Sequence, residues 1–137
     1  MSSTDVPHWE RLAAHDDFRG RMRELSRCGE RRLFHPLDAG DYVLSIQASS
    51  EHDSVPARAA PADEVEAWEV AVFTAGGQLL DETQDPELVA LPREWLRYWR
   101  GGVARRVPTA IVRVLLDRFA LGPEEFDRFV LEGCDPE

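Results

Sequence analysis

The sequence predicts an α+β fold in which a small antiparallel sheet of about three strands packs against four or five helices. Two stretches, 41–49 and 66–74, alternate between apolar and polar residues, as half-buried strands do. Most other ordered stretches carry apolar residues three and four positions apart, which is typical of amphipathic helices. The chain has 137 residues, of which 43% are hydrophobic and 31% charged. That size is usual for one domain, so we expect a single domain over 1–137.

The first expected element is a helix over about residues 7–28. Pro7 suits the first turn of a helix, and apolar residues follow it at helical spacing. Gly20 interrupts the pattern and could divide this helix into two pieces.

The next elements are strands. In 41–49 the side chains of Tyr42, Leu44 and Ile46 fall on one face, and 66–74 repeats the pattern. Gly76 and Gly77 can adopt the positive φ angles that tight turns require, so we expect a hairpin to a third strand at 77–81. Between the first two strands, 50–64 contains two prolines and no periodicity, which predicts a long surface loop.

The last third of the chain is expected to be helical. A helix over 92–100 would begin at Pro92, carry Trp95 and Trp99 on one face, and end at a pair of glycines. A second helix begins at Pro108 and is apolar on nearly every side, so we expect it to be buried. A third, over 123–132, has glutamates in its first turn.

Charge gives the main indication of function. The chain carries a net charge of −10, and all of its basic residues are arginine. Residues 38–87 hold Arg58 alone against twelve acidic residues, whereas 93–118 hold seven arginines against two acidic residues. An acidic surface can attract a protein that normally binds nucleic acid, because it imitates the field of a phosphate backbone.

We therefore predict a non-enzymatic interaction protein, such as an inhibitor, an immunity-type protein or an accessory subunit. Its partner would be a protein with a basic surface, of the nucleic-acid-handling or defence-related kind. The residues predicted to contact that partner are the acidic ones outside the apolar face of the sheet: Glu51, Asp53, Asp63, Glu64, Glu66, Asp81, Glu82 and Asp85.

Two other functions are compatible with the sequence. A small enzyme or ligand-binding domain could have its site between the 50–64 loop and the sheet, where residue types used in nucleophilic catalysis are present: Ser45, Ser49, Ser50, Ser54, His52 and Asp53. The segment 93–106 interleaves arginines with aromatic rings, a composition that binds phosphates and stacks on bases. In that case the contact residues are Arg93, Arg97, Arg100, Arg105 and Arg106. The simpler interpretation of this segment places its tryptophans in the core and pairs its arginines with the acidic residues.

Histidine and cysteine positions predict neither a metal nor a cofactor. His8 and His15 would share a helix face beside Asp16, but no further ligands follow at the spacing of a metal site. Cys28 and Cys134 are too far apart in sequence for such a site and are expected to be free thiols, the alternative being a disulfide between the two ends of the chain. No apolar run approaches the ~20 residues needed to cross a bilayer, and no signal segment is evident at Met1. We expect a cytoplasmic protein without membrane contact.

One stretch resembles a known kind of protein. The segment Leu44-Ser45-Ile46-Gln47-Ala48-Ser49, followed by His52, by Pro56 and Arg58, and by a second strand at 70–73, resembles small proteins of phage or prophage type. In those a similar strand precedes a histidine and a Pro-Arg pair, whereas here Ala57 separates Pro56 from Arg58. The resemblance implies a phage or mobile-element origin and no particular activity.

Overall fold

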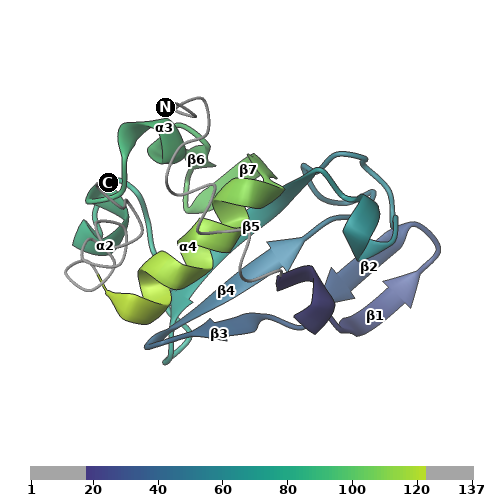
Figure 1. The fold of residues 1–137 in the computed structure, drawn as a ribbon, viewed down its shortest axis with the longest axis horizontal. Helices are drawn as coiled ribbons and strands as arrows, with labels where there is room; N and C mark the ends of the chain where they lie inside the picture. The colour runs from purple at the N-terminus through teal and green to yellow at the C-terminus, as the bar shows by residue number, and fades with distance from the viewer. Residues whose placement is uncertain (1–17, 123–137) are drawn as a thin grey trace, which may run out of the picture.

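The computed structural model describes residues 18–122. Five strands form one antiparallel sheet in the spatial order β3-β4-β5-β7-β6, and β1 and β2 form a separate two-stranded hairpin whose β2 lies beside β4 (Figure 1). The strands are β1 (Glu24–Cys28), β2 (Arg31–Phe34), β3 (Leu37–Ala39), β4 (Tyr42–Gln47), β5 (Ala67–Thr74), β6 (Trp99–Arg100) and β7 (Val103–Pro108).

One long helix covers one face of this sheet. Figure 1 shows α4 (Thr109–Leu121) lying across β5 and β7, with its last turn near the β3-β4 end. The other helical elements are single turns: α2 (Pro86–Val89), α3 (Arg93–Leu96), and the 3-10 turns η1 (Phe18–Arg21) and η2 (Ala62–Glu64). No helix in residues 18–122 has the length and apolar content that crossing a bilayer requires.

The core lies between α4 and the inward face of the sheet. Leu44 from β4, Val70 from β5 and Leu115 from α4 are fully buried. Trp68 joins this core to the hairpin end of the molecule, because its ring lies 5.3 Å from that of Phe18 and 6.2 Å from that of Phe34. Burial of such rings contributes strongly to stability.

The predicted fold class is wrong. Residues 18–122 contain two sheets, of two and five strands, and three α-helices of which only α4 is longer than one turn. The expected three-stranded sheet under four or five helices is therefore replaced by a mainly β structure with one covering helix.

The first error falls at the expected helix over 7–28. Its described part, 18–28, forms η1 and then β1, which pairs with β2 across a turn at Gly29 with a φ of 65°. Phe18 in η1 is buried, and Met22, which follows this 3-10 turn, is partly buried against the same core. Their separation of four residues therefore resembles helical spacing although no α-helix forms here. Residues 7–17 lie outside the described part of the chain.

The second error falls at 92–108. Trp95 and Trp99 are both buried, as expected of core residues, but Trp95 belongs to α3 and Trp99 to β6. Gly101 and Gly102, with φ angles of 63° and 87°, form the β6-β7 turn instead of ending a helix. An irregularity in the β5-β7 pairing disturbs the alternation in β7, so periodicity did not reveal this strand.

Three expected elements are confirmed. The stretches 41–49 and 66–74 form the antiparallel neighbours β4 and β5, in a register that runs from Tyr42 opposite Thr74 to Gln47 opposite Glu69. The helix predicted from Pro108 is α4. After the turn at Gly76-Gly77, however, the expected strand 77–81 forms only an isolated bridge to β5. The predicted helix 123–132 lies outside the described residues.

The 50–64 segment is a surface loop that is fixed at several points. Arg32, which is 3% exposed, donates from its two terminal nitrogens to the carbonyl oxygens of Ala48 and Ala60, at 2.6 and 2.7 Å. Val55 forms a bridge with Ala67 of β5. Because backbone hydrogen bonds and a buried guanidinium hold it, this loop presents its side chains from defined positions.

The burial of Leu115 predicts a large loss of stability on truncation. Leu115→Ala should lower the free energy of unfolding by ~2–5 kcal/mol, because it removes apolar contacts and leaves a cavity. Val89→Ala is the matched control, since Val89 is 52% exposed and its truncation should change stability by no more than ~0.5 kcal/mol. Chemical denaturation measures both. Similar losses in the two variants would contradict the described core.

Candidate interaction site

Glu51 and Asp53, two of the predicted acidic residues, form ion pairs with arginines. Arg31 donates from Nε to the Glu51 carboxylate at 2.8 Å, and Arg106 donates from Nε to the Asp53 carboxylate at 2.8 Å. The guanidinium of Arg105 lies 3.8 Å from the other Asp53 oxygen. Asp53 therefore brings together the acidic set and the arginine set predicted from the sequence, through an exposed pairing of modest strength.

The carboxylates of Asp81, Glu82 and Asp85 accept hydrogen bonds within and between turns of the backbone. Asp81 accepts hydrogen bonds from the backbone and hydroxyl of Thr83, while Asp85 accepts one from the Asp81 backbone. Glu82 accepts from the backbone N–H groups of Gly101 and Gly102, at 2.8 and 2.9 Å. Partial burial opposes the charge of Glu82, but the N–H donors of Gly102, Glu82 itself and Gly101 outweigh it and lower its pKa.

Asp63, Glu64 and Glu66 differ from the other five. All three residues are exposed, and their carboxylates form no hydrogen bond or ion pair with any part of residues 18–122. Their backbone, in contrast, is held firmly. Val65 between them is 2% exposed, and Thr109 donates from its hydroxyl to the Val65 carbonyl and from its backbone N–H to the Glu66 carbonyl.

The arginine set does not form a stacking surface. Trp95 and Trp99 are 1% and 4% exposed, so neither ring can lie against a base. Arg97 instead covers Tyr98, with its guanidinium carbon 5.1 Å from the ring centre. Arg93 and Arg100 are exposed. The interleaved aromatic residues of 93–106 thus belong mainly to the core, while most of its arginines face solvent.

The serine and histidine side chains of the loop form a turn. The Ser49 hydroxyl lies 2.8 Å from Nδ1 of His52 and accepts a hydrogen bond from the Glu51 backbone at 3.2 Å. Ser49 is completely buried, and Ser54, which is 4% exposed, donates to the Pro56 carbonyl. Because a nucleophile must be reached by its substrate, this geometry favours a structural role for both hydroxyls. Within residues 18–122, no three His, Cys, Asp or Glu side chains converge as metal ligands would.

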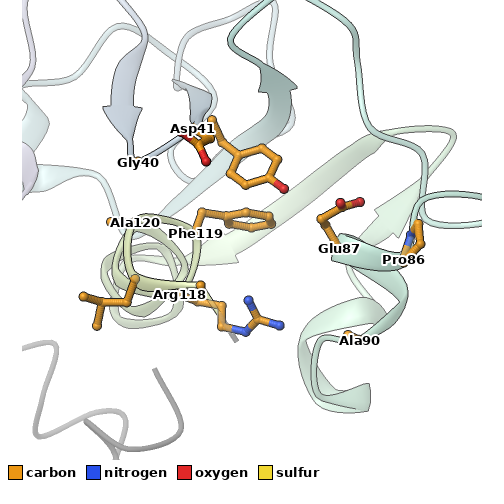
Figure 2. A pocket seen from close by; sticks show the side chains of 11 residues that line it. Gly40, Asp41, Pro86, Glu87, Ala90, Arg118, Phe119 and Ala120 are labelled. Carbon is orange, nitrogen blue, oxygen red and sulfur yellow. The ribbon is translucent and has the colours of Figure 1, made fainter. Parts of the chain in front are cut away.

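A pocket of about 560 Å³ lies at the other end of the molecule and was not predicted (Figure 2). It is bounded by the β3-β4 turn, α2 and the last turn of α4. Burial and then Glu87 raise the pKa of the Tyr42 hydroxyl, and the Tyr42 ring meets that of Phe119 edge to face at 5.2 Å. In the sequence, Tyr42 and Phe119 are two apolar positions among many, and Glu87 is one of many acidic residues. No local pattern in the sequence therefore predicts that the three lie at one pocket.

Comparisons with protein-family models, with curated proteins and with solved structures find no match for this chain.

The Glu82 contacts predict a pH-dependent contribution to stability. Glu82→Gln replaces one acceptor oxygen with an NH₂ group that must face a glycine N–H, so it should cost about 1 kcal/mol at pH 7. The pKa of Glu82 is lower in the folded chain than its ordinary value of 4.5, so the stabilisation is present above that value and is lost as the pH falls through the folded pKa. Denaturation at pH 7 and pH 3 should show this difference shrinking. Glu94→Gln, at an exposed position in α3, is the control and should show no such trend.

Proposed function

We propose that the protein is a non-enzymatic interaction protein that binds a partner with a basic surface through Asp63, Glu64 and Glu66. The observation that carries the proposal is that these three carboxylates are exposed and unpaired within residues 18–122, while the backbone that bears them is anchored to the core. The other five predicted residues already bond to arginines, backbone or hydroxyl groups of the same chain.

A fixed backbone strengthens such a surface. Flexible acidic loops lose conformational freedom on binding, and that loss reduces affinity. Here η2 follows Ala60, whose carbonyl accepts from Arg32, and only two residues separate η2 from β5. Carboxylates presented in this way attract a basic partner over long range and increase the rate of association more than they change the final contacts.

The partner class follows from the same chemistry. A group of carboxylates on an ordered surface complements arginine and lysine clusters, which are typical of proteins that bind nucleic acid. An inhibitor, an immunity-type protein or an accessory subunit of a nucleic-acid-handling or defence-related protein would use such a surface. The resemblance to small phage or prophage proteins implies an origin that fits these roles.

Charge reversal tests the proposal. Asp63→Arg combined with Glu64→Arg should slow association with the partner at least tenfold at low ionic strength, and the difference should shrink as salt is added. The partner is first identified by affinity capture from the native host with mass spectrometry, and association rates are then measured by surface plasmon resonance. Both reversed residues are exposed, so the thermal midpoint should stay within a few degrees of the parent value.

The matched control separates position from net charge. Asp38→Arg combined with Glu94→Arg changes the net charge equally, at exposed residues of β3 and α3. This variant should bind far more rapidly than the 63/64 variant. Equal slowing in both would mean that only total charge matters, and greater damage from reversing Arg97 and Arg100 would place the site in the arginine segment. Either result overturns the proposal.

A further inference from the structure

We propose that the pocket between α2 and the end of α4 binds an organic cation, namely a guanidinium or primary ammonium group carried on an alkyl stem. The inference is independent of the proposed function. Figure 1 shows α2 and β2 at opposite ends of the molecule, and Arg32 of β2 holds the loop that carries Asp63 and Glu64.

Negative groups converge on this pocket from three elements. Asp41 comes from the β3-β4 turn and Glu87 from α2, and both line the cavity (Figure 2). The third is the carboxyl end of α4, where backbone carbonyls carry the negative end of the helix dipole. Gly40 lies against these carbonyls so closely that a Cβ atom there would be 2.9 Å from the Ala120 oxygen and 3.0 Å from the Phe119 oxygen.

Arg118 also lines the pocket, so the sign of the local field needs a separate argument. In Figure 2 its guanidinium extends from α4 toward α2. The pKa of the Tyr42 hydroxyl responds to all three of these charged groups. Burial, the charge and hydrogen bond of Glu87, and then the charge of Asp41 raise the pKa of Tyr42, while Arg118 lowers it by the smallest contribution. The pocket is lined by two carboxylates, Asp41 and Glu87, and by one guanidinium, Arg118, so negative charge is in excess in the lining and favours a cation over an anion.

The remaining lining suits an alkyl stem. Phe119, Pro86, Ala90 and Leu121 contribute apolar surface, and the pocket volume of about 560 Å³ lies in the range of small-molecule sites. The Tyr42 and Phe119 rings can also attract a cation through their faces. A carboxylate has about four acceptor positions, so Glu87, which lines the pocket, can accept hydrogen bonds from a ligand.

Titration calorimetry on the full chain tests this assignment with three probes: n-butylguanidinium, n-butylammonium and n-butyrate. The two cations should bind and the carboxylate should not. Glu87→Gln should weaken cation binding roughly tenfold, because it removes the charge that pairs with the ligand. Tyr42→Phe keeps the ring and should weaken binding less than threefold. Asp38→Asn, which removes an exposed carboxylate outside the pocket, is the matched control and should leave binding unchanged.

A further probe distinguishes the two sources of such a cation. A pentapeptide with one central arginine and blocked ends should bind as well as n-butylguanidinium if the pocket takes a side chain of a protein, and much more weakly if it takes a free amine or guanidine. Both results support the cation site. Binding of n-butyrate in preference to the cations, binding of none of the probes, or equal cation binding by the folded Glu87→Gln variant would overturn it.

Discussion

The position of the 50–64 loop, and with it the proposed acidic surface, depends on one buried arginine. Arg32 points inward from β2, lies with its guanidinium carbon 4.3 Å from the centre of the Phe34 ring, and donates to one carbonyl just before the loop, that of Ala48, and to one within it, that of Ala60. Burial is the main cause that lowers its pKa, which shows the cost of desolvating this cation. Hydrogen bonds to two carbonyls offset that cost and close the loop onto the hairpin.

A neutral amide performs a related task beside Arg32. The Gln47 side chain accepts from the Phe34 backbone N–H at 2.8 Å and donates to the Phe34 carbonyl at 3.0 Å. It thus reproduces the paired bonds of a neighbouring strand at the point where β3 gives way to β2. The hairpin β1-β2 is thereby attached to β4 although the ladder between the two sheets is interrupted. Two polar side chains, rather than apolar packing alone, fix the relation of the hairpin to the sheet.

Elements with a regular apolar period could be predicted from the sequence, and elements whose inward residues are polar could not. The stretches 41–49 and 66–74 and the helix from Pro108 bury apolar residues at the period of their element. In β2 the inward positions are Arg32 and Phe34. Because a charged residue occupies one of these core positions, the sequence of β2 lacks the apolar alternation that would predict a strand. Trp95 and Trp99 share one core but come from two elements, which a four-residue spacing cannot reveal.

The candidate site, like the fold, could be predicted from the sequence only in part. Charge patterning identified the acidic residues, but which of them remain available depends on contacts between distant positions. Asp53 and Arg106 are 53 residues apart and meet only because the loop and β7 lie side by side in the folded chain. The pocket likewise combines a turn, a short helix and a helix end that are separated by long stretches of sequence. Spacing rules concern one element at a time, so they could find neither arrangement.

For the proposed surface we expect the position of a carboxylate to matter more than net charge, because the described residues are nearly neutral. Residues 18–122 hold 14 arginines and 16 acidic residues, so they are nearly neutral although the whole chain has a net charge of −10. Exposed pairs such as Arg31 with Glu51 cancel each other's field beyond a Debye length of about 8 Å in physiological salt. In the proposed interaction, a basic partner is steered by carboxylates that no arginine of residues 18–122 neutralises. The backbone that carries Asp63, Glu64 and Glu66 is held in place, whereas the other five predicted contact residues bond to groups of the same chain.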